Sequence, residues 1–180
     1  KASVTQRKQA LIIMKQLMEK QGPASLSADT ELIRTNDPEG NAETIRVPGL
    51  MLGGRLIKLN ADPNVPIPVV DEMMALTGYH SSIMLRTSDA GDFVRVATSV
   101  TQGGRRQIGF VLPARQGDGS PNPFARSVIA GKTALGRTYV EDFVFISTAL
   151  PLRDQDNHII GCYGVGIRQD LMENLRQVFM

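Results

Sequence analysis

Two arginines lie within otherwise apolar segments, and their charge makes them candidates for binding an anion. Arg95 lies between two valines in the segment 93–99, and Arg106 follows a Gly-Gly turn. A guanidinium among valines must be paired or face a polar cavity, because burying an unpaired charge is prohibitively costly. Acidic residues are nearly absent from the neighbouring predicted strands, and the exceptions are Glu141 and Asp142. This scarcity favours a ligand anion as the partner of Arg95, although an ion pair at the surface stays open.

Hydroxyl groups lie close to these arginines in the predicted arrangement. Ser147 and Thr148 interrupt the apolar segment 144–152, and Tyr139 opens the same predicted strand. With the arginines they predict a small pocket lined by a few donors, in which Ser147 is a secondary donor and Phe145 an apolar wall. The guanidinium fork suits a carboxylate, so we expect an organic anion.

The pattern of histidines, cysteine and glycines argues against catalysis. His80 and His158 fall in predicted turns, where a solvated side chain is expected. Cys162 is the only cysteine, which excludes an internal disulfide and a cysteine-based metal cluster. The glycine-rich segment 161–166 lies inside a strand pattern with no following βα unit, so close packing explains it better than a phosphate loop does. We expect no catalytic residue, no metal and no cofactor.

Composition limits the class of protein. The 180 residues fit one domain, and 42% hydrophobic with 21% charged residues is typical of a globular protein. The net charge is +2, but the basic residues are dispersed and aromatic residues make up only 5%, so no nucleic-acid partner is expected. No apolar run reaches the roughly 20 residues that span a bilayer. Both ends read as helix-like, which we expect of a segment between two membrane helices, or of a processed soluble protein.

The segment 4–20 has the spacing of an amphipathic helix. Leu11 and Ile12 widen its apolar stripe beyond what one small sheet would cover, so the pattern suits a core helix and a homodimer contact equally. The sequence Gln21-Gly22-Pro23 ends it.

The rest of the chain alternates short strands with two short helices. Turn signals mark the polar stretch 34–42, and the strand-like pieces that follow are 44–52, 55–60, 81–86, 93–100, 107–112, 138–152 and 158–167. Short helices are expected at 69–76 and from Asn122 to Gly131, and a last helix at 169–180. Strands joined by tight turns must be antiparallel. The order therefore predicts an α+β fold with an antiparallel sheet of about five strands, similar to the PAS-like sensor modules.

Several motifs resemble, in order, those of the Cache domains of bacterial chemoreceptors, closest to the single Cache type 3 and the Cache 3/Cache 2 fusion groups. The runs 92–100 (DFVRVATSV) and 103–109 (GGRRQIG) match an F-x-R-x-x-T strand, a turn and an R-x-x-G strand. Shorter matches are VPGL, VD and TG upstream, AGK, GR and PLRD downstream, and a closing IGCYGVG. They span about 44–168.

The resemblance implies a single extracytoplasmic sensor domain, with a 1–24 helical segment, a 44–168 Cache core and a 169–180 helix toward the membrane. It implies a methyl-accepting chemotaxis receptor of the inner membrane with a periplasmic domain, a homodimer, and binding of a small carboxylate rather than catalysis. The ligand-binding residues predicted from the pattern and the resemblance together are Arg95, Thr98, Arg106, Tyr139, Phe145 and Ser147. In a regular strand Arg95 and Thr98 point to opposite faces, so a shared pocket requires a bulge or a strand end.

One segment departs from the family pattern. Where relatives carry W-Y-x-T-A-Y, the chain reads VFISTA at 144–149, so a wider or more apolar ligand, or sensing through a partner protein, is open. The same domain could serve a histidine kinase or a cyclic-dinucleotide enzyme, or form a free periplasmic binding protein.

Overall fold

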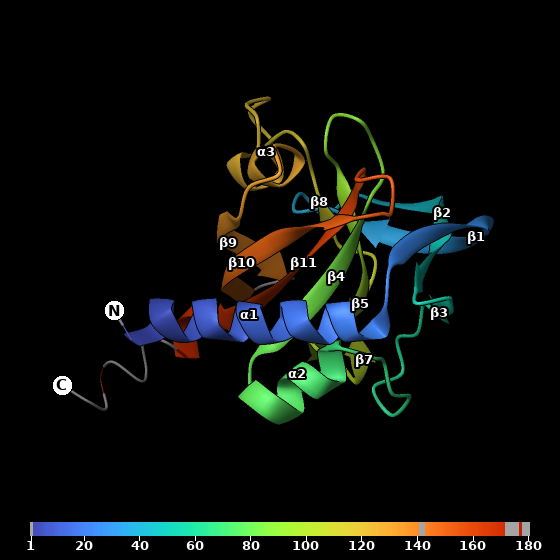
Figure 1. Ribbon diagram of the computed structural model, residues 1–180. Coiled ribbons are helices and arrows are strands. Elements are labelled where there is room, and N and C mark those ends of the chain that lie inside the picture. The colour runs from blue at the N-terminus through green and yellow to red at the C-terminus, as the bar shows by residue number, and fades with distance from the viewer. Residues whose placement is uncertain (1, 141–142, 172–176, 178–180) are drawn as a thin grey trace.

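The computed structural model describes residues 2–140, 143–171 and 177 (Figure 1). The helices are α1 (Ala2–Gln21), α2 (Val70–Thr77) and α3 (Pro123–Ile129). The strands are β1 (Ala24–Asn36), β2 (Ala42–Leu52), β3 (Arg55–Ile57), β4 (His80–Arg86), β5 (Phe93–Thr98), β6 (Thr101–Gln102), β7 (Arg105–Arg106), β8 (Val111–Leu112), β9 (Ala134–Val140), β10 (Phe143–Arg153) and β11 (Ile159–Arg168).

The central sheet has the strand order β8-β5-β4-β11-β10-β9, and each pair of neighbouring strands is antiparallel. The predicted α+β fold with one antiparallel sheet is confirmed, with six strands where about five were expected. The difference arises at 138–152, which we predicted as one strand. It folds back on itself as β9 and β10, with Tyr139 opposite Val144. The apolar character of both halves concealed the reversal.

Helix α1 covers one face of this sheet (Figure 1). Its buried residues Met14 and Met18 share the largest hydrophobic cluster with Tyr163 and Val165 of β11. A fully buried side chain such as Met14 stabilises the fold by roughly 1.5–3 kcal/mol. The predicted helix is confirmed, and it is a core element.

The wide apolar stripe of α1 is largely buried within the domain. Leu11 is only 6% exposed, whereas Ile12 is 57% exposed. Because Met14 is 0% exposed, it cannot contact a second copy while the domain is folded. A dimer through this helix remains a prediction, and its contact would have to centre on Ile12.

The two short helices have the ends that the sequence indicates. Helix α2 ends at Gly78, whose φ of 71° is the left-handed conformation common at helix C-termini. Asn122 is the N-cap of α3, and its side chain accepts a hydrogen bond from the amide of Phe124 at 3.0 Å. Both predicted helices are confirmed.

A separate three-stranded sheet, β1-β2-β3, lies beside the central one (Figure 1). The hairpin of β2 and β3 around Gly53 and Gly54 is confirmed. Strand β1 was not predicted, and it takes in the start of the supposed turn stretch at 34–36. Most of its side chains are exposed, so it lacks the alternation by which strands are recognised.

The predicted strand 107–112 is only partly formed. Its last two residues make β8, while Gly109 leaves the strand conformation with a φ of 89°. The amide of Asn36 donates instead to the Gly109 carbonyl at 3.0 Å, which ties the β1 end to the central sheet. A side chain at Gly109 would overlap the carbonyl of Arg34, so this close approach requires glycine.

Strand β11 ends at Arg168, and residues 169–171 and 177 are helical. The other positions of the predicted 169–180 helix lie outside the described residues. Within the described part of the chain, no helix is both long and apolar enough to cross a membrane.

Candidate functional site

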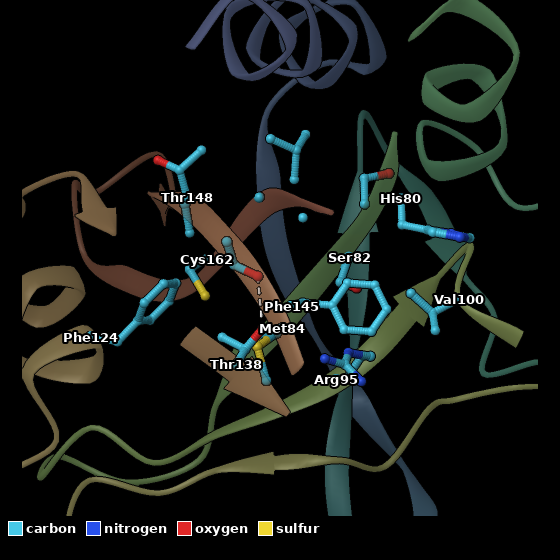
Figure 2. Close-up of a pocket in the computed structure, with 16 residues that line it drawn as sticks. His80, Ser82, Met84, Arg95, Val100, Phe124, Thr138, Phe145, Thr148 and Cys162 are labelled. Atoms are coloured by element: carbon cyan, nitrogen blue, oxygen red, sulfur yellow. Dashed lines mark hydrogen bonds between the residues drawn. The ribbon is translucent and has the colours of Figure 1, made fainter. Parts of the chain in front are cut away.

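A pocket with a cavity of about 50 Å³ lies on the face of the sheet opposite α1 (Figure 2). Cys162, Gly164 and Gly166 alternate along β11 and line its middle. Strand β4 contributes Ser82 and Met84 from one side, since these residues pair with Gly164 and Cys162. Strand β10 closes the other side, and the N-terminal turn of α3 adds Phe124.

The glycines of β11 line the hollow where this strand packs closely on β10. Gly164 lies so close to β10 that a Cβ there would overlap the Thr148 carbonyl oxygen. At Gly166 a Cβ would meet the Ser147 hydroxyl at 2.8 Å. The glycine-rich segment thus serves close packing between strands. It is part of a strand and does not form a phosphate loop.

Arg95 is the cation of this pocket. It is 5% exposed, and its nearest polar partner is the Gln107 carbonyl oxygen, which lies 3.5 Å from Nη1. Its guanidinium stacks on Phe110 with 5.0 Å between Cζ and the ring centre, and Nε has no hydrogen-bond partner. Burial lowers the pKa of Arg95 to about 10, which still leaves the group charged at neutral pH. No carboxylate among the described residues pairs with it.

A bulge in β5 turns Arg95 toward the pocket. Ala97 pairs with Ile83 and Arg95 pairs with Met84, so Val96 has no opposite residue. The extra residue places Arg95 and Thr98 on one face, as the sequence required for a shared pocket. Val96 and Ala97 both enter the hydrophobic cluster under α1.

Thr98 lies behind the pocket wall and does not line the cavity. It is fully buried, and its hydroxyl is 2.8 Å from the Ser82 hydroxyl. The same oxygen accepts a hydrogen bond from the Val100 amide at 3.1 Å. Thr98 therefore orients Ser82 and Val100, which do line the cavity.

Ser147 and Phe145 line the pocket from β10, where the sequence analysis expected them. The hydroxyl of Ser147 is 2.7 Å from that of Thr138 on β9, so one of the two donates to the other and each retains acceptor capacity. Phe145 is 4% exposed and meets the His80 ring edge to face at 6.2 Å. Figure 2 shows Arg95 and Phe124 at opposite sides of the pocket.

His80 was predicted to be a solvated turn residue, and this is wrong. It opens β4, lines the pocket, and its Nδ1 is 3.1 Å from the Ser99 hydroxyl. Burial lowers the pKa of His80, and the charge of Arg168 lowers it further. The position of the turn was misjudged because Tyr79 and His80 directly follow the Gly78 helix end. His158 is in a turn and exposed, as expected.

Arg106 does not reach the pocket, contrary to the prediction. Its guanidinium donates to both carboxylate oxygens of Asp71, at 2.8 and 2.9 Å, and to the Thr98 carbonyl at 2.9 Å. Further bonds go to the carbonyls of Asp62, Pro63 and Val65. Because its donors are committed to the protein, Arg106 holds the connector before α2 against the β5 end.

Three residues named by the sequence analysis cannot be placed fully. Tyr139 belongs to β9, but its side chain lies outside what the structure describes. Glu141 and Asp142 lie outside the described residues.

Ser82, Thr138, Cys162 and Phe124 were not predicted as site residues. Each stands in a separate element, and only the pairing of β4, β9, β10 and β11 brings the first three together. The alternation of small residues along β11 was the one available signal. Burial raises the pKa of the Cys162 thiol to about 12, so it lines the pocket as a neutral group.

The family model of the Cache 3/Cache 2 fusion domain matches residues 3–180. Comparisons with curated proteins and with solved structures gave no significant match. The long N-terminal helix, the curled antiparallel sheet and the pocket on its free face agree with this match. Cache domains are extracytoplasmic sensor modules that bind small molecules. The chain belongs to the Cache 3/Cache 2 fusion domain family.

Proposed function

We propose that this domain is the periplasmic sensor of a transmembrane chemotaxis receptor and that it detects an organic anion bound to Arg95. The observation that carries the proposal is the buried guanidinium of Arg95, which has no carboxylate partner among the described residues and faces a cavity. The charge must be compensated, because an isolated buried cation costs several kcal/mol or more.

The pocket offers an anion a further donor beside Arg95. The hydroxyls of Thr138 and Ser147 are at its walls, and because one of them donates to the other, one hydroxyl proton of the pair is free for a ligand. An acceptor with two oxygens, such as a carboxylate, would satisfy Nε of Arg95 and one of these hydroxyls. No acidic side chain is present among the described lining residues, which disfavours ligands that carry an ammonium group.

The lining supports binding without chemistry. A nucleophile requires activation by a base or by a lowered pKa. Burial instead raises the pKa of Cys162 and lowers that of His80, so the pocket favours a neutral thiol and a neutral imidazole. We therefore propose that the ligand leaves the pocket unchanged.

The position of the pocket suits signalling. Strand β11 lines it and continues at Arg168 into the helical residues 169–171. Arg168 pairs with Phe145 in the sheet and stacks on Phe143 at 3.8 Å. A ligand that moves Phe145 would thus act on the strand that leaves the domain. The same geometry would also serve a histidine kinase or a cyclic-dinucleotide enzyme. Joining the domain to a chemotaxis signalling module tests the assignment to a chemotaxis receptor.

Thermal unfolding with a panel of small carboxylates tests the site. A ligand at 100 times its dissociation constant stabilises by about 2.7 kcal/mol, which is a shift of roughly 5–10 °C in a domain of this size. We expect Arg95→Ala to abolish the shift and Arg95→Lys to weaken it. Arg105→Ala, at an exposed position in the neighbouring β7, is the control and should keep it. A full shift in Arg95→Ala, or an experimental structure with Glu141 or Asp142 bonded to Arg95, would overturn the assignment.

A further inference from the structure

A second, larger hollow of about 680 Å³ adjoins the pocket. It lies between the two outer strands of the central sheet, because Leu112 of β8 and Leu135 of β9 both line it. The sheet therefore curls until its edges face one groove, and α3 stands over this end of the sheet (Figure 1).

The groove and the pocket share walls. Phe124 and Thr138 line both hollows. Arg95 lines the inner pocket, while Phe110, on which its guanidinium stacks, lines the outer groove. Phe110 thus contacts the buried cation and also lines the groove.

The two hollows differ in what they can hold. A buried water needs roughly 10–15 Å³ of such space, so the inner cavity of about 50 Å³ accommodates a carboxylate head and little more. The groove has more than ten times this volume, and its apolar lining includes Phe110, Leu112, Phe124 and Leu135. Two acidic and two basic residues, Asp37, Glu39, Arg115 and Arg137, also line it. Asp37 is occupied within its own turn, where it accepts hydrogen bonds from the amides of Glu39 and Asn41.

We infer that the ligand is a carboxylate with an extended apolar body, whose head binds Arg95 and whose body passes Phe124 into the groove. The inference rests on the proposed anion site and adds the second compartment. Burial fixes the orientation, because Arg95 at the inner end is buried without a carboxylate partner among the described residues, whereas Arg115 and Arg137 at the groove are exposed to solvent. Such a ligand buries its apolar body against Phe124 and Leu135, whereas a short acid leaves the groove to water.

Calorimetric titration of the 180-residue chain with acetate, butanoate, hexanoate, octanoate and decanoate, each below its micelle concentration, tests the inference. We expect the affinity to rise about three- to fourfold for each methylene that enters the groove. Octanol has the same body without the charge, so it should bind far more weakly than octanoate. Arg95→Ala should remove binding of the whole series.

A charged side chain introduced into the groove tests the role of the groove separately from that of the inner pocket. Leu135 is 63% exposed and can be changed to Asp without opening the core. Leu135→Asp should keep acetate and butanoate binding and lose the gain with chain length. The matched control is Leu76→Asp, at a 67% exposed position on α2 that does not line the groove; it should behave as the unmodified chain.

The outcomes distinguish the two proposals. If short acids bind and the affinity does not rise with length, or if Leu135→Asp leaves the rise intact, the groove is not part of the site and this inference is wrong. If no carboxylate of any length binds, the anion site itself is wrong.

Discussion

Arg106 and Asp71 form a two-point ion pair in which each carboxylate oxygen accepts a hydrogen bond from a different guanidinium nitrogen, at 2.8 and 2.9 Å. The side chain of Arg106 is 3% exposed and that of Asp71 is 36% exposed. The pair links the start of α2 to β7, and a third bond from Arg106 reaches the Thr98 carbonyl behind the pocket. Arg106, which was predicted to bind the ligand, thus holds the pocket wall in place.

Asp71→Asn should therefore destabilise the domain. Loss of one partner from a fully buried pair costs roughly 3–5 kcal/mol, and solvent screening at the partly exposed Asp71 reduces this to about 2 kcal/mol. Urea unfolding at neutral pH measures the change. Asp29→Asn, on the exposed β1, is the control and should have almost no effect; an equally small effect of Asp71→Asn would show that the pair contributes nothing.

The same pair predicts an acid response. Burial alone would raise the pKa of Asp71, but hydrogen bonds from Arg106 and from the Ile67 amide and the arginine charge together lower it below 3.8. A lowered pKa stabilises the fold above the unfolded value of 3.8, and this contribution is lost as the pH falls through the folded value. The stability difference between the unmodified chain and Asp71→Asn should shrink between pH 5 and pH 3. A constant difference would argue against the assignment.

His80 should make the stability depend on pH in a higher range. Burial and the Arg168 charge lower its pKa from 6.5, so the unfolded chain binds this proton more readily than the folded domain does. Stability therefore rises with pH as it passes upward through the folded pKa toward and past 6.5, and the neutral ring contributes fully above that range. Melting curves between pH 5 and 8 should show this rise, and it should be flatter in His80→Gln. An equally steep rise in His80→Gln would contradict this assignment.

Self-association through α1 should depend on Ile12. This residue is 57% exposed, while Leu11, Ile13, Met14, Leu17 and Met18 of the same helix are buried or partly buried within the domain. Ile12→Glu should abolish the concentration-dependent dimer in sedimentation equilibrium and leave the melting temperature nearly unchanged. Lys15→Glu, an exposed neighbour, controls for the change in charge. A strictly monomeric chain at millimolar concentration would contradict the dimer.

Gly164 should tolerate no side chain. Its Cβ would overlap the backbone oxygen of Thr148, which cannot move without breaking the pairing of β10 and β11. We expect Gly164→Ala to cost several kcal/mol, as is typical of overpacked sites. Gly136→Ala is the comparison, since its Cβ would stand 3.5 Å from Phe124, an ordinary contact, and should be close to neutral. Equal stability of the two variants in thermal melts would disprove the close approach.

The sequence predicted elements whose signals are local. Asn122 before a proline and Gly78 after an apolar helix mark ends that depend only on nearby residues. Arg95, Phe145 and Ser147 were found because a charge or a hydroxyl within an apolar strand is conspicuous. Features that depend on pairing between distant segments of the chain were not predicted. Strand β1 pairs along most of its length with β2, and Arg106 is held by Asp71, 35 positions earlier in the chain.

The bulge in β5 makes the binding face depend on the length of a strand as well as on its composition. If Val96 were paired in the ladder instead of bulging, side chains would alternate regularly, and Arg95 would turn into the apolar layer under α1. A substitution in β5 changes one contact, whereas a deletion at a paired position outside the bulge moves the residues beyond it to the opposite face of the sheet. Divergence of this family should therefore conserve the spacing between arginine and threonine more strictly than the residues between them, and ligand preference should evolve through the walls around a fixed cation.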